Sequence, residues 1–574
     1  MSKIYTTTEY NIENLLSFIQ TGSIGVPDLQ RPFVWKNRQV RELFDSLYNG
    51  YPVGFFLFWK TKSESESHLI GRGGTNKIPD KVIIDGQQRL TSLYAVIKGE
   101  EVLDNYYNFK CIKLAFNPKT EKIEVSSPAY EKSNEWISDI SILWSGSIFD
   151  IITDYINKNT FQSENDKKEI PKRIQKLYDI KNISFSALEI LDTINIDQVS
   201  EIFVRINSRG KKLNQLDFIL TLLSVYWEEG RKSIEDFARN KDNTKNKFEH
   251  LLIISPGDII KILVSFTFFK GRLEDIYNLL KGRDTSTRSF DEKLRLGRLE
   301  KLQKNLPIVL NETDWNTFFK ILIGLGFKNS KTINASNNIL FSYLFFLIGK
   351  YKFGLEFYHL EKYIGKYYVY LVLSSKYSSS TETTLEKELK IIENLQSGDD
   401  FISYIEKQIE RDLGNDFWET GILNDIISSS TGNNVYLVYL ASKLRENHRV
   451  LFSDVFLSDL LDDKFSGIKK KYLDIHHIFP KNYLKTNLAI TDIGEVNQVA
   501  NYVYLNFHDN IKIGDASPDI YYDQFLNIYG VEKVKKGLKD NEIPEDFYNL
   551  SYYEFLEQRR RLMITAIKKY FYSL

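Results

Sequence analysis

The spacing of apolar residues changes along the chain, and the first part shows mainly short, dense runs. Val53–Trp59 and Lys81–Asp85 are rich in β-branched and aromatic residues, which predicts two strands. Between them, Lys62–Asp80 is polar and rich in serine and glycine, so we expect a long loop. Gln39–Gly50 carries apolar residues at helical spacing and ends on glycine, which predicts a helix. These elements indicate a mixed α/β unit.

From about residue 190 to about residue 440, apolar residues recur at helical spacing, which predicts a helical middle part. Its most apolar run, Ile339–Ile348, is only about half as long as the ~20 residues of a membrane-spanning helix. We therefore expect a buried core helix. The serine-rich segment Ser374–Glu388 is expected to be a loop that leads into a helix with a Ser or Thr cap.

Length and composition narrow the class of protein. A chain of 574 residues is longer than one hydrophobic core usually supports, so we expect several structural units. Lys plus Arg and Asp plus Glu both number 76, so any contact with nucleic acid must come from local patches. The single cysteine, Cys111, excludes an internal disulfide, and the first residues lack the features of a secretory signal. We expect a cytoplasmic protein with no membrane partner.

A histidine-rich segment near the C-terminus has the residue types that phosphodiester hydrolysis needs. The sequence DIHHIFPKNY contains His476 and His477, and the strand-like NYVYL begins with Asn501. Asn510 follows nine residues later, two residues after His508. Hydrolysis requires a base that activates water, a cation that neutralises charge and polar groups that hold both. The alternative, a histidine pair that only caps a strand, does not account for the two spaced asparagines.

This segment resembles the HNH, or His-Me finger, nucleases, in which a β-hairpin packs against a helix around one metal ion. The resemblance implies that His477 is the general base and that Asn501 fixes the hairpin loop and orients the base. It also implies that His476 and Asn510 bind the metal. His508, two residues before Asn510, is a less favoured candidate for a ligand or a phosphate contact. Many members carry a carboxylate where His476 stands. The imidazole of His476 shifts the metal preference toward softer ions, which makes Ni²⁺, Co²⁺ or Zn²⁺ alternatives, while Mg²⁺ or Mn²⁺ remains the expectation.

A second candidate site lies where the predicted strand Lys81–Asp85 turns into a helix. Free N–H groups at a helix N-terminus bind anions, and an arginine adds a forked donor suited to phosphate. The sequence therefore predicts an anion site, against the alternative of a tight turn with a surface arginine. No P-loop sequence is present, so nucleotide hydrolysis here would not use the Walker geometry. The candidate residues are Asp85, Gly86, Gln87, Gln88, Arg89 and Thr91.

Three segments together resemble the ParB/sulfiredoxin-like domains that begin GmrSD-type type IV restriction enzymes and the SspE and BrxU defence proteins. They are DGQQR, LQRPFVW at Leu29–Trp35, and EIFVRINSRGKKL at Glu201–Leu213. The resemblance implies hydrolysis of GTP or another nucleoside triphosphate, coupled to recognition of modified or phage DNA. The same match places Arg31, Arg205, Asn207 and Gly210 near the pocket. The aromatic residues Phe33, Trp35 and Tyr94 either line this pocket or, as is more common for aromatic residues, belong to the core.

Basic residues near the C-terminus are candidate DNA contacts. The last helical stretch, YYEFLEQRRRLMITAIKKYF, places five of them among apolar residues at helical spacing, where they could follow phosphates. The alternative is a solvated basic face on a helix that packs against the rest of the protein. The candidates are Arg559, Arg560, Arg561, Lys568 and Lys569, together with Lys481 after the histidine motif.

These features predict a multidomain α+β protein. We expect a ParB/sulfiredoxin-like α/β domain over residues 1–230, a helical domain over 231–440 and a ββα-metal HNH nuclease embedded in helices over 441–574. The predicted function is that of a metal-dependent, nucleotide-regulated DNA endonuclease or nickase of bacterial antiphage defence. Two alternatives stay open, namely an HNH nuclease whose N-terminal domain only binds DNA, and a regulatory or toxin-like protein with an inactive nuclease fold. The expected partners are DNA, a nucleotide, and a second copy of the chain or other proteins of a defence system.

Overall fold

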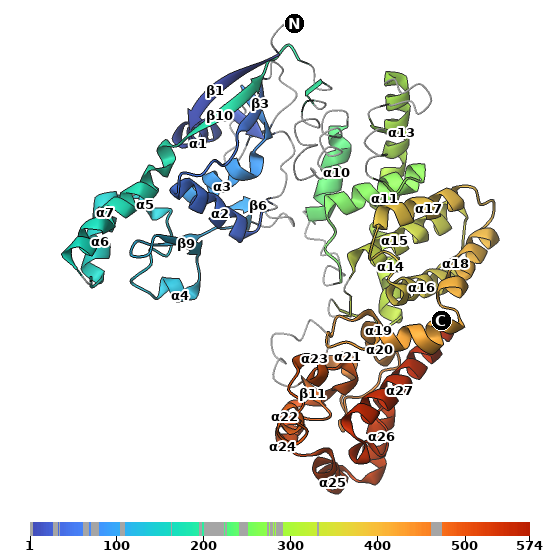
Figure 1. Ribbon diagram of the computed structural model, residues 1–574. Coiled ribbons are helices and arrows are strands. Elements are labelled where there is room, and N and C mark those ends of the chain that lie inside the picture. Colours follow the sequence, from blue (N-terminus) through green and yellow to red (C-terminus); the bar gives the residue numbers. More distant parts are fainter. Residues whose placement is uncertain are drawn as a thin grey trace. The chain divides into compact units, whose positions relative to one another are not determined.

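The computed structural model comprises two compact units, Met1–Ser233 and Ile234–Leu574. Figure 1 shows the helices and strands of each unit. The predicted loop Lys62–Asp80 and the segment Glu201–Leu213 lie almost entirely outside the described residues. The residues described are 4–26, 33, 35–60, 68–69, 80–103, 109–161, 163–194, 198–199, 202, 223, 227–239, 251–272, 275, 279–280, 282, 291–329, 332–333, 335–460 and 473–574.

The first unit is built on a mixed six-stranded sheet with the order β1-β10-β3-β5-β2-β4. The predicted strand at residues 81–85 is confirmed as β5, which pairs antiparallel with β3 and parallel with β2. Strand β3 begins three residues later than predicted, because Gly54 has a φ of +89° that a strand cannot accommodate. The strands are β1 (Tyr5–Asn11), β2 (Ile24–Val26), β3 (Phe56–Lys60), β4 (His68–Leu69), β5 (Lys81–Asp85) and β10 (Ser184–Ile190).

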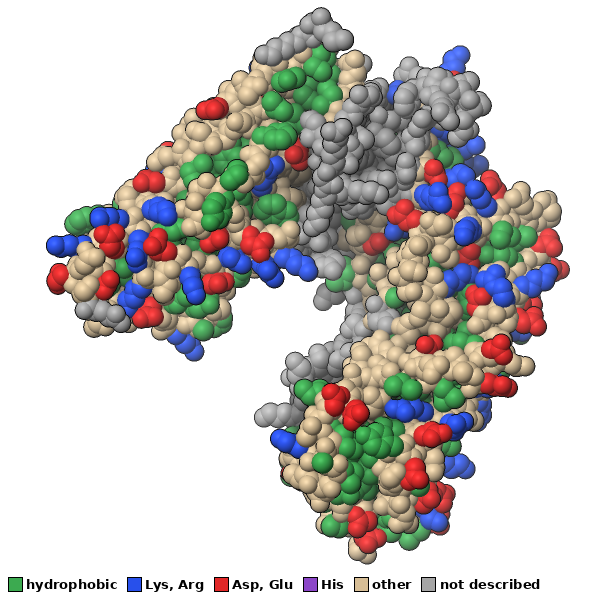
Figure 2. All heavy atoms as spheres, viewed as in Figure 1, with side chains coloured by type: hydrophobic (Ala, Val, Ile, Leu, Met, Phe, Trp, Pro, Cys, Tyr) green, Lys and Arg blue, Asp and Glu red, His purple; other side chains and the backbone are tan. Residues whose placement is uncertain are grey.

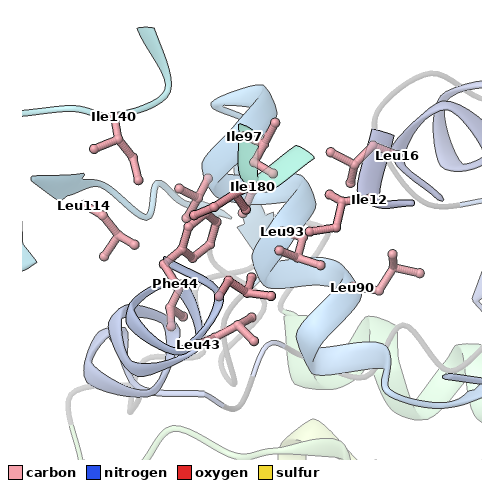
Figure 3. Packing of buried hydrophobic residues seen from close by; sticks show 14 of the residues in the cluster. Ile12, Leu16, Leu43, Phe44, Leu90, Leu93, Ile97, Leu114, Ile140 and Ile180 are labelled. Carbon is pink, nitrogen blue, oxygen red and sulfur yellow. The ribbon is translucent and has the colours of Figure 1, made fainter. Parts of the chain in front are cut away.

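Three helices cover one face of this sheet and enclose its main core. They are α1 (Ile12–Gln20), α2 (Asn37–Tyr48) and α3 (Gln87–Lys98), and α2 confirms the helix predicted near residues 39–50. Figure 3 shows buried side chains from all three helices meeting in this core. Smaller elements complete the unit: β6 (Val102–Leu103), β7 (Phe109–Lys110), β8 (Leu114–Asn117), β9 (Lys122–Val125), α4 (Pro128–Glu131), α5 (Ile142–Ser145), α6 (Ile148–Lys158), α7 (Glu164–Tyr178) and η1 (Asp179–Asn182). Helix α10 (Glu228–Arg239) contains the boundary between the two units.

The second unit begins with helices, as predicted for the middle of the chain. The predicted core helix is confirmed as α15, whose residues from Asn338 to Leu347 are all buried. The predicted serine-rich loop is confirmed over residues 375–380, while residues 381–388 already belong to α17. Ser380 precedes α17, but its side chain makes no capping hydrogen bond, so the expected Ser or Thr cap is wrong. The elements are α11 (Pro256–Phe268), α13 (Glu292–Val309), α14 (Glu312–Gly324), α15 (Ser336–Leu347), η3 (Ile348–Lys352), α16 (Phe357–Ser374), α17 (Thr381–Glu393), α18 (Gly398–Asp412), η4 (Phe417–Gly421), α19 (Ile422–Asp425) and α20 (Asn434–Arg445).

The C-terminal part of the second unit contains a two-stranded antiparallel sheet followed directly by a helix. The strands are β11 (Leu473–His477) and β12 (Tyr502–Asn506), and the helix is α24 (Phe507–Ile513). The long helix α27 ends the chain and begins with a capping box between Ser551 and Glu554. The remaining elements are α21 (Leu457–Leu460), α22 (Lys481–Asn487), α23 (Ile493–Val496), η6 (Val499–Asn501), α25 (Pro518–Tyr529), α26 (Val531–Asp540), η7 (Phe547–Asn549) and α27 (Tyr552–Tyr572).

The mixture of small sheets and many helices confirms the α+β class. The ParB/sulfiredoxin-like and HNH assignments and the division into three domains stay predictions. Among the described residues, no helix combines the length and the apolar character needed to cross a bilayer. On the face seen in Figure 2, basic and acidic side chains are interspersed, in keeping with equal numbers of the two charges.

Candidate nuclease site and the DGQQR turn

The strand pairing brings the two histidines beside the asparagine-bearing helix. His476 pairs with Val503 and His477 with Tyr502, at the end of β11 where the hairpin opens. Helix α24 begins immediately after β12, and the Asn506 side chain caps it by accepting a hydrogen bond from the backbone N–H of Asp509 at 2.9 Å. This start places Asn510 in the first turns of α24, next to β11.

His476 and Asn510 meet directly. The Nδ1–H of His476 donates to the Oδ1 atom of Asn510 at 2.7 Å. His476 is 6% exposed, and its Nε2 atom is buried with no hydrogen-bond partner among the described residues. Burial lowers the pKa of His476 to about 4, neighbouring His477 lowers it further and the bond to Asn510 opposes the shift. The imidazole is therefore neutral at pH 7, which is the form that binds metals.

The donor set at this point fits a divalent cation. An imidazole nitrogen and an amide oxygen are both metal ligands. Because Nδ1 of His476 carries the proton that it donates to Asn510, Nε2 keeps the free lone pair and is the atom of His476 that could bind a cation. The described part of the chain contains no cluster of three or more His, Cys, Asp or Glu side chains that could hold a metal. An ion bound by His476 and Asn510 would complete its coordination with water and phosphate oxygens, as Mg²⁺ commonly does.

His477 is held in one orientation by a residue that the sequence did not indicate. Its Nε2 atom lies 3.0 Å from Oδ1 of Asn497, and its ring meets the Tyr502 ring edge-on at 5.0 Å. An amide oxygen only accepts, so Nε2 carries the proton and Nδ1 keeps a lone pair. Burial lowers the pKa of His477 to about 4, opposed by the Asn497 bond and aided by the charge of Lys481. A neutral, oriented imidazole can accept a proton from water.

Asn501 is fully buried and ties down the loop that follows the histidines. Its Oδ1 accepts from the backbone N–H of Phe479 at 2.8 Å, and its Nδ2 donates to the Phe479 carbonyl at 3.1 Å and the Val496 carbonyl at 3.5 Å. The backbone N–H of Ile478 donates to the Asn501 carbonyl at 2.9 Å. This geometry is the loop fixation expected from the resemblance, while the effect of Asn501 on catalysis stays a prediction.

The prediction that Arg559 contacts DNA is wrong. Arg559 is 1% exposed, and its guanidinium donates to the carbonyls of Ala500 at 2.8 Å and Asn541 at 3.3 Å. The physical reason is its helical face, because Phe555 and Met563, one turn before and one turn after, are also buried. Arg559 therefore supports, from inside the protein, the peptide that precedes Asn501.

The other predicted DNA contacts differ in how accessible they are. Lys481 is exposed at the first position of α22, four residues after His477. Arg560 is partly buried and donates to Oε1 of Gln498 at 2.9 Å. Arg561 is exposed and pairs with Glu557 at 2.9 Å. Lys568, Lys569 and His508 are exposed.

The DGQQR segment forms a sharp turn from β5 into α3, as predicted. Gly86 is the N-cap of α3 with a φ of +93°, and a Cβ atom there would lie 2.5 Å from the Phe56 ring. The Arg89 guanidinium donates to the backbone carbonyls of Val53 and Phe55, the latter at 2.8 Å. It also lies 3.8 Å from the Asp85 carboxylate. In this structure Arg89 is therefore a clamp on the backbone, which differs from the predicted surface donor for phosphate.

The rest of the predicted N-terminal pocket is only partly described. Arg31, Arg205, Asn207 and Gly210 lie outside the described residues. Gln88 is 9% exposed, and Gln87 and Thr91 are partly buried in the first turns of α3. The three aromatic candidates belong to the core, since Phe33 is a core residue and Trp35 and Tyr94 pack against it.

Comparison with known proteins supports the resemblance of the N-terminal part. Residues 12–224 match the family described as GmrSD restriction endonuclease, N-terminal domain. Along nearly its whole length the chain is also similar to uncharacterized protein MJ0686 of Methanocaldococcus jannaschii. The two are 23% identical over 97% of this chain and 98% of that protein. The N-terminal part of this chain is therefore similar to the N-terminal domain of GmrSD restriction endonucleases.

Proposed function

We propose that this chain is a metal-dependent DNA endonuclease of the restriction type, and that its C-terminal site cuts one strand of DNA at a time. The observation that carries the proposal is the pairing of two neutral histidines with two asparagines at one end of a hairpin. His477 is oriented by Asn497, and His476 lies against Asn510. The match of residues 12–224 to a restriction endonuclease domain supports the assignment to host defence against phage DNA.

In the proposed reaction, each residue has a separate task. The Nδ1 atom of His477 accepts a proton from the attacking water, because Nε2 is committed to Asn497. His476 and Asn510 would hold Mg²⁺ or Mn²⁺, which neutralises charge on the scissile phosphate when bound. Asn501 keeps the loop behind His477 fixed through Phe479. A single site cuts one strand in each event, so a double-strand break needs two cuts or two copies of the chain.

The test is relaxation of supercoiled plasmid by the full chain with Mg²⁺ or Mn²⁺. His477→Ala removes the base and should reduce nicking by about 10²–10⁴-fold. Asn487→Ala is the control for the effect of an alanine substitution close to the site, since Asn487 is an exposed residue on the neighbouring helix α22. If His477→Ala nicks within about tenfold of wild type at equal folded content, His477 is not the base.

We also propose that the DGQQR unit binds and hydrolyses a nucleoside triphosphate and thereby controls the nuclease. The match to the GmrSD N-terminal domain and the turn of Asp85 and Gly86 into a 12-residue helix support this. An enzyme that nicks without control would damage the host chromosome, and coupling of the two sites by about 1–3 kcal/mol would provide such control. Asp85→Ala should then abolish phosphate release and alter cutting of the proper target.

The competing hypothesis is an N-terminal unit that only binds DNA. Release of phosphate from GTP, ATP, CTP and UTP, measured with and without modified DNA, separates the two. If no nucleotide is hydrolysed under any of these conditions, the DNA-binding hypothesis replaces nucleotide control, and the nuclease proposal is unaffected.

A further inference from the structure

Outside the nuclease site, helix α16 carries a row of aromatic and basic side chains that are exposed or partly buried. We call this row the α16 strip and define it as Tyr358, His359, Lys362, Tyr363 and Lys366, with Tyr572 from the end of α27. Tyr358 is 68% exposed and Tyr572 is 59% exposed, which is high for tyrosine side chains in a folded domain. Figure 1 shows the C-terminal end of α27 next to α16.

The rings of the strip are arranged in steps along the helix. The His359 and Tyr363 rings are nearly parallel, with an interplanar angle of 10° and centroids 6.4 Å apart. Aromatic rings in a row are the arrangement on which successive bases of a single strand stack. Tyr358 meets His359 edge-on at 5.6 Å and extends the row toward the start of α16.

Lysines lie between and beyond these rings. The Nζ atom of Lys362 lies 5.1 Å from the Tyr363 ring, and that of Lys366 lies 5.9 Å from the Tyr572 ring. The Lys568 Nζ atom lies 6.0 Å from the ring of Trp418, which in turn lies 6.0 Å from that of Tyr572. None of these three lysines has a carboxylate oxygen of a described residue within 4.0 Å, whereas many lysines elsewhere are paired.

The acidic groups near the strip limit its charge. Glu361 is exposed on the same helix, and Glu406 of α18 partly offsets the burial that lowers the pKa of Lys366. The surface is therefore only modestly basic. A duplex hides its bases and is held mainly by many phosphate contacts, whereas a single strand is held by stacking on aromatic rings with a few cations alongside. The α16 strip, with several aromatic rings and few cations, matches the way in which proteins bind a single strand.

We propose that the α16 strip binds single-stranded nucleic acid, with bases stacked on Tyr358, Tyr363 and Tyr572 and phosphates near Lys362 and Lys366. From residue 358 to 366 a helix rises about 12 Å, and Tyr572 lies beside Lys366 at the end of this row. At 3.4 Å or more per nucleotide, the helix part of the row accommodates about three to four nucleotides. The binding does not depend on cleavage, so it holds whether or not the nuclease proposal does.

The test uses the full chain carrying His477→Ala, so that the probe is not cut, and a fluorescein-labelled oligo(dT) followed by fluorescence anisotropy. Tyr358→Ala with Tyr572→Ala should weaken binding by about tenfold or more, because two rings on which bases stack are removed. Phe149→Ala is the matched control, since Phe149 is a 74% exposed aromatic residue on α6 of the first unit. Both tyrosines are exposed, so we expect no change in melting temperature.

A charge reversal gives an independent measurement. Lys362→Glu with Lys366→Glu should lower the slope of log affinity against log salt by about 1.4, because each lysine that neutralises a phosphate of a single strand contributes ~0.7 to that slope. Lys167→Glu with Lys168→Glu, two exposed lysines on α7, is the matched control with the same change in net charge.

Three results would overturn the proposal. The first is affinity for oligo(dT) within about twofold of the parent in the double tyrosine variant. The second is a duplex of the same length bound more tightly than the single strand through the same residues. The third is sedimentation that shows the parent as a dimer and the tyrosine variant as a monomer, which would assign the strip to a second copy of the chain.

Discussion

Replacing Asn501 with alanine removes the side chain that joins the histidine loop to the turn before β12. The change deletes three hydrogen bonds and leaves the backbone N–H and carbonyl of Phe479 without their partner, in a place where Phe479 is 3% exposed. Each buried group left unpartnered costs about 1–3 kcal/mol, so we expect the second unit to lose roughly 2–6 kcal/mol of unfolding free energy from these two groups. Because folded domains have about 5–15 kcal/mol in reserve, most molecules should remain folded at low temperature.

The change should also slow catalysis in those molecules that remain folded. Phe479 is two residues from His477, so a loosened loop lets the imidazole leave its position, and a misplacement of about 1 Å can cost on the order of 10²-fold in rate. Plasmid nicking is measured well below the melting temperature of the variant, with circular dichroism to show equal folded content and Asn487→Ala as the control. Nicking within about threefold of wild type, together with an unchanged melting temperature, would refute the role of Asn501 as the loop clamp.

Three further predictions concern the candidate nuclease site and the DGQQR turn. Arg559→Met should destabilise the second unit by about 1–3 kcal/mol in thermal unfolding, because the Ala500 carbonyl loses a charged donor, and Arg559→Lys should recover part of the loss. Unchanged DNA affinity in Arg559→Lys would agree with a buried position. His476→Ala and Asn510→Ala should each shift the Mg²⁺ or Mn²⁺ activation curve to higher concentration, with partial recovery in excess metal. Superimposable metal titrations would place the cation elsewhere. Arg89→Lys should lower the melting temperature of the first unit by several degrees, since a lysine cannot donate to two carbonyls in a fork. An unchanged melting temperature would contradict the role of Arg89 in holding the backbone of Val53 and Phe55.

Much of the local structure could be predicted because it depends on neighbours in the sequence. The strand at residues 81–85 and the core helix over Ser336–Leu347 follow from apolar patterns within one segment. Gly86 marks the turn into α3 because its φ of +93° suits glycine. In the candidate site, His476 and Asn510 meet as the spacing of the resembled motif requires. These relations span one hairpin and one helix.

Asn497 could not have been selected from the sequence. It lies 20 residues after His477, in the segment between the two strands, and its role depends on how α23 and the following turn return the chain to the histidine. Asn482 and Asn487 occur in the same spacer, and nothing in their residue type distinguishes them from Asn497. The partner of the proposed base is therefore set by tertiary packing.

Two of the arginines that the sequence assigned to phosphates, Arg89 and Arg559, differ from the prediction in the same way, and this bears on the proposed nucleotide site. Arg559 and Arg89 both donate to backbone carbonyls inside their own unit, because a guanidinium has five donors in a planar fork and can join two segments of chain that lie far apart in sequence. For the DGQQR turn, Arg89 is already occupied by the carbonyls of Val53 and Phe55. A triphosphate bound there would meet the N–H groups at the start of α3, and its positive partners would come from other residues. Arg31 and Arg205 are the candidates that the resemblance provides.

Arg31→Ala and Arg205→Ala should then reduce nucleotide affinity without lowering the melting temperature, whereas Arg89→Lys should lower both. Equal losses of stability in all three variants would show that these arginines are structural and that the phosphates bind elsewhere.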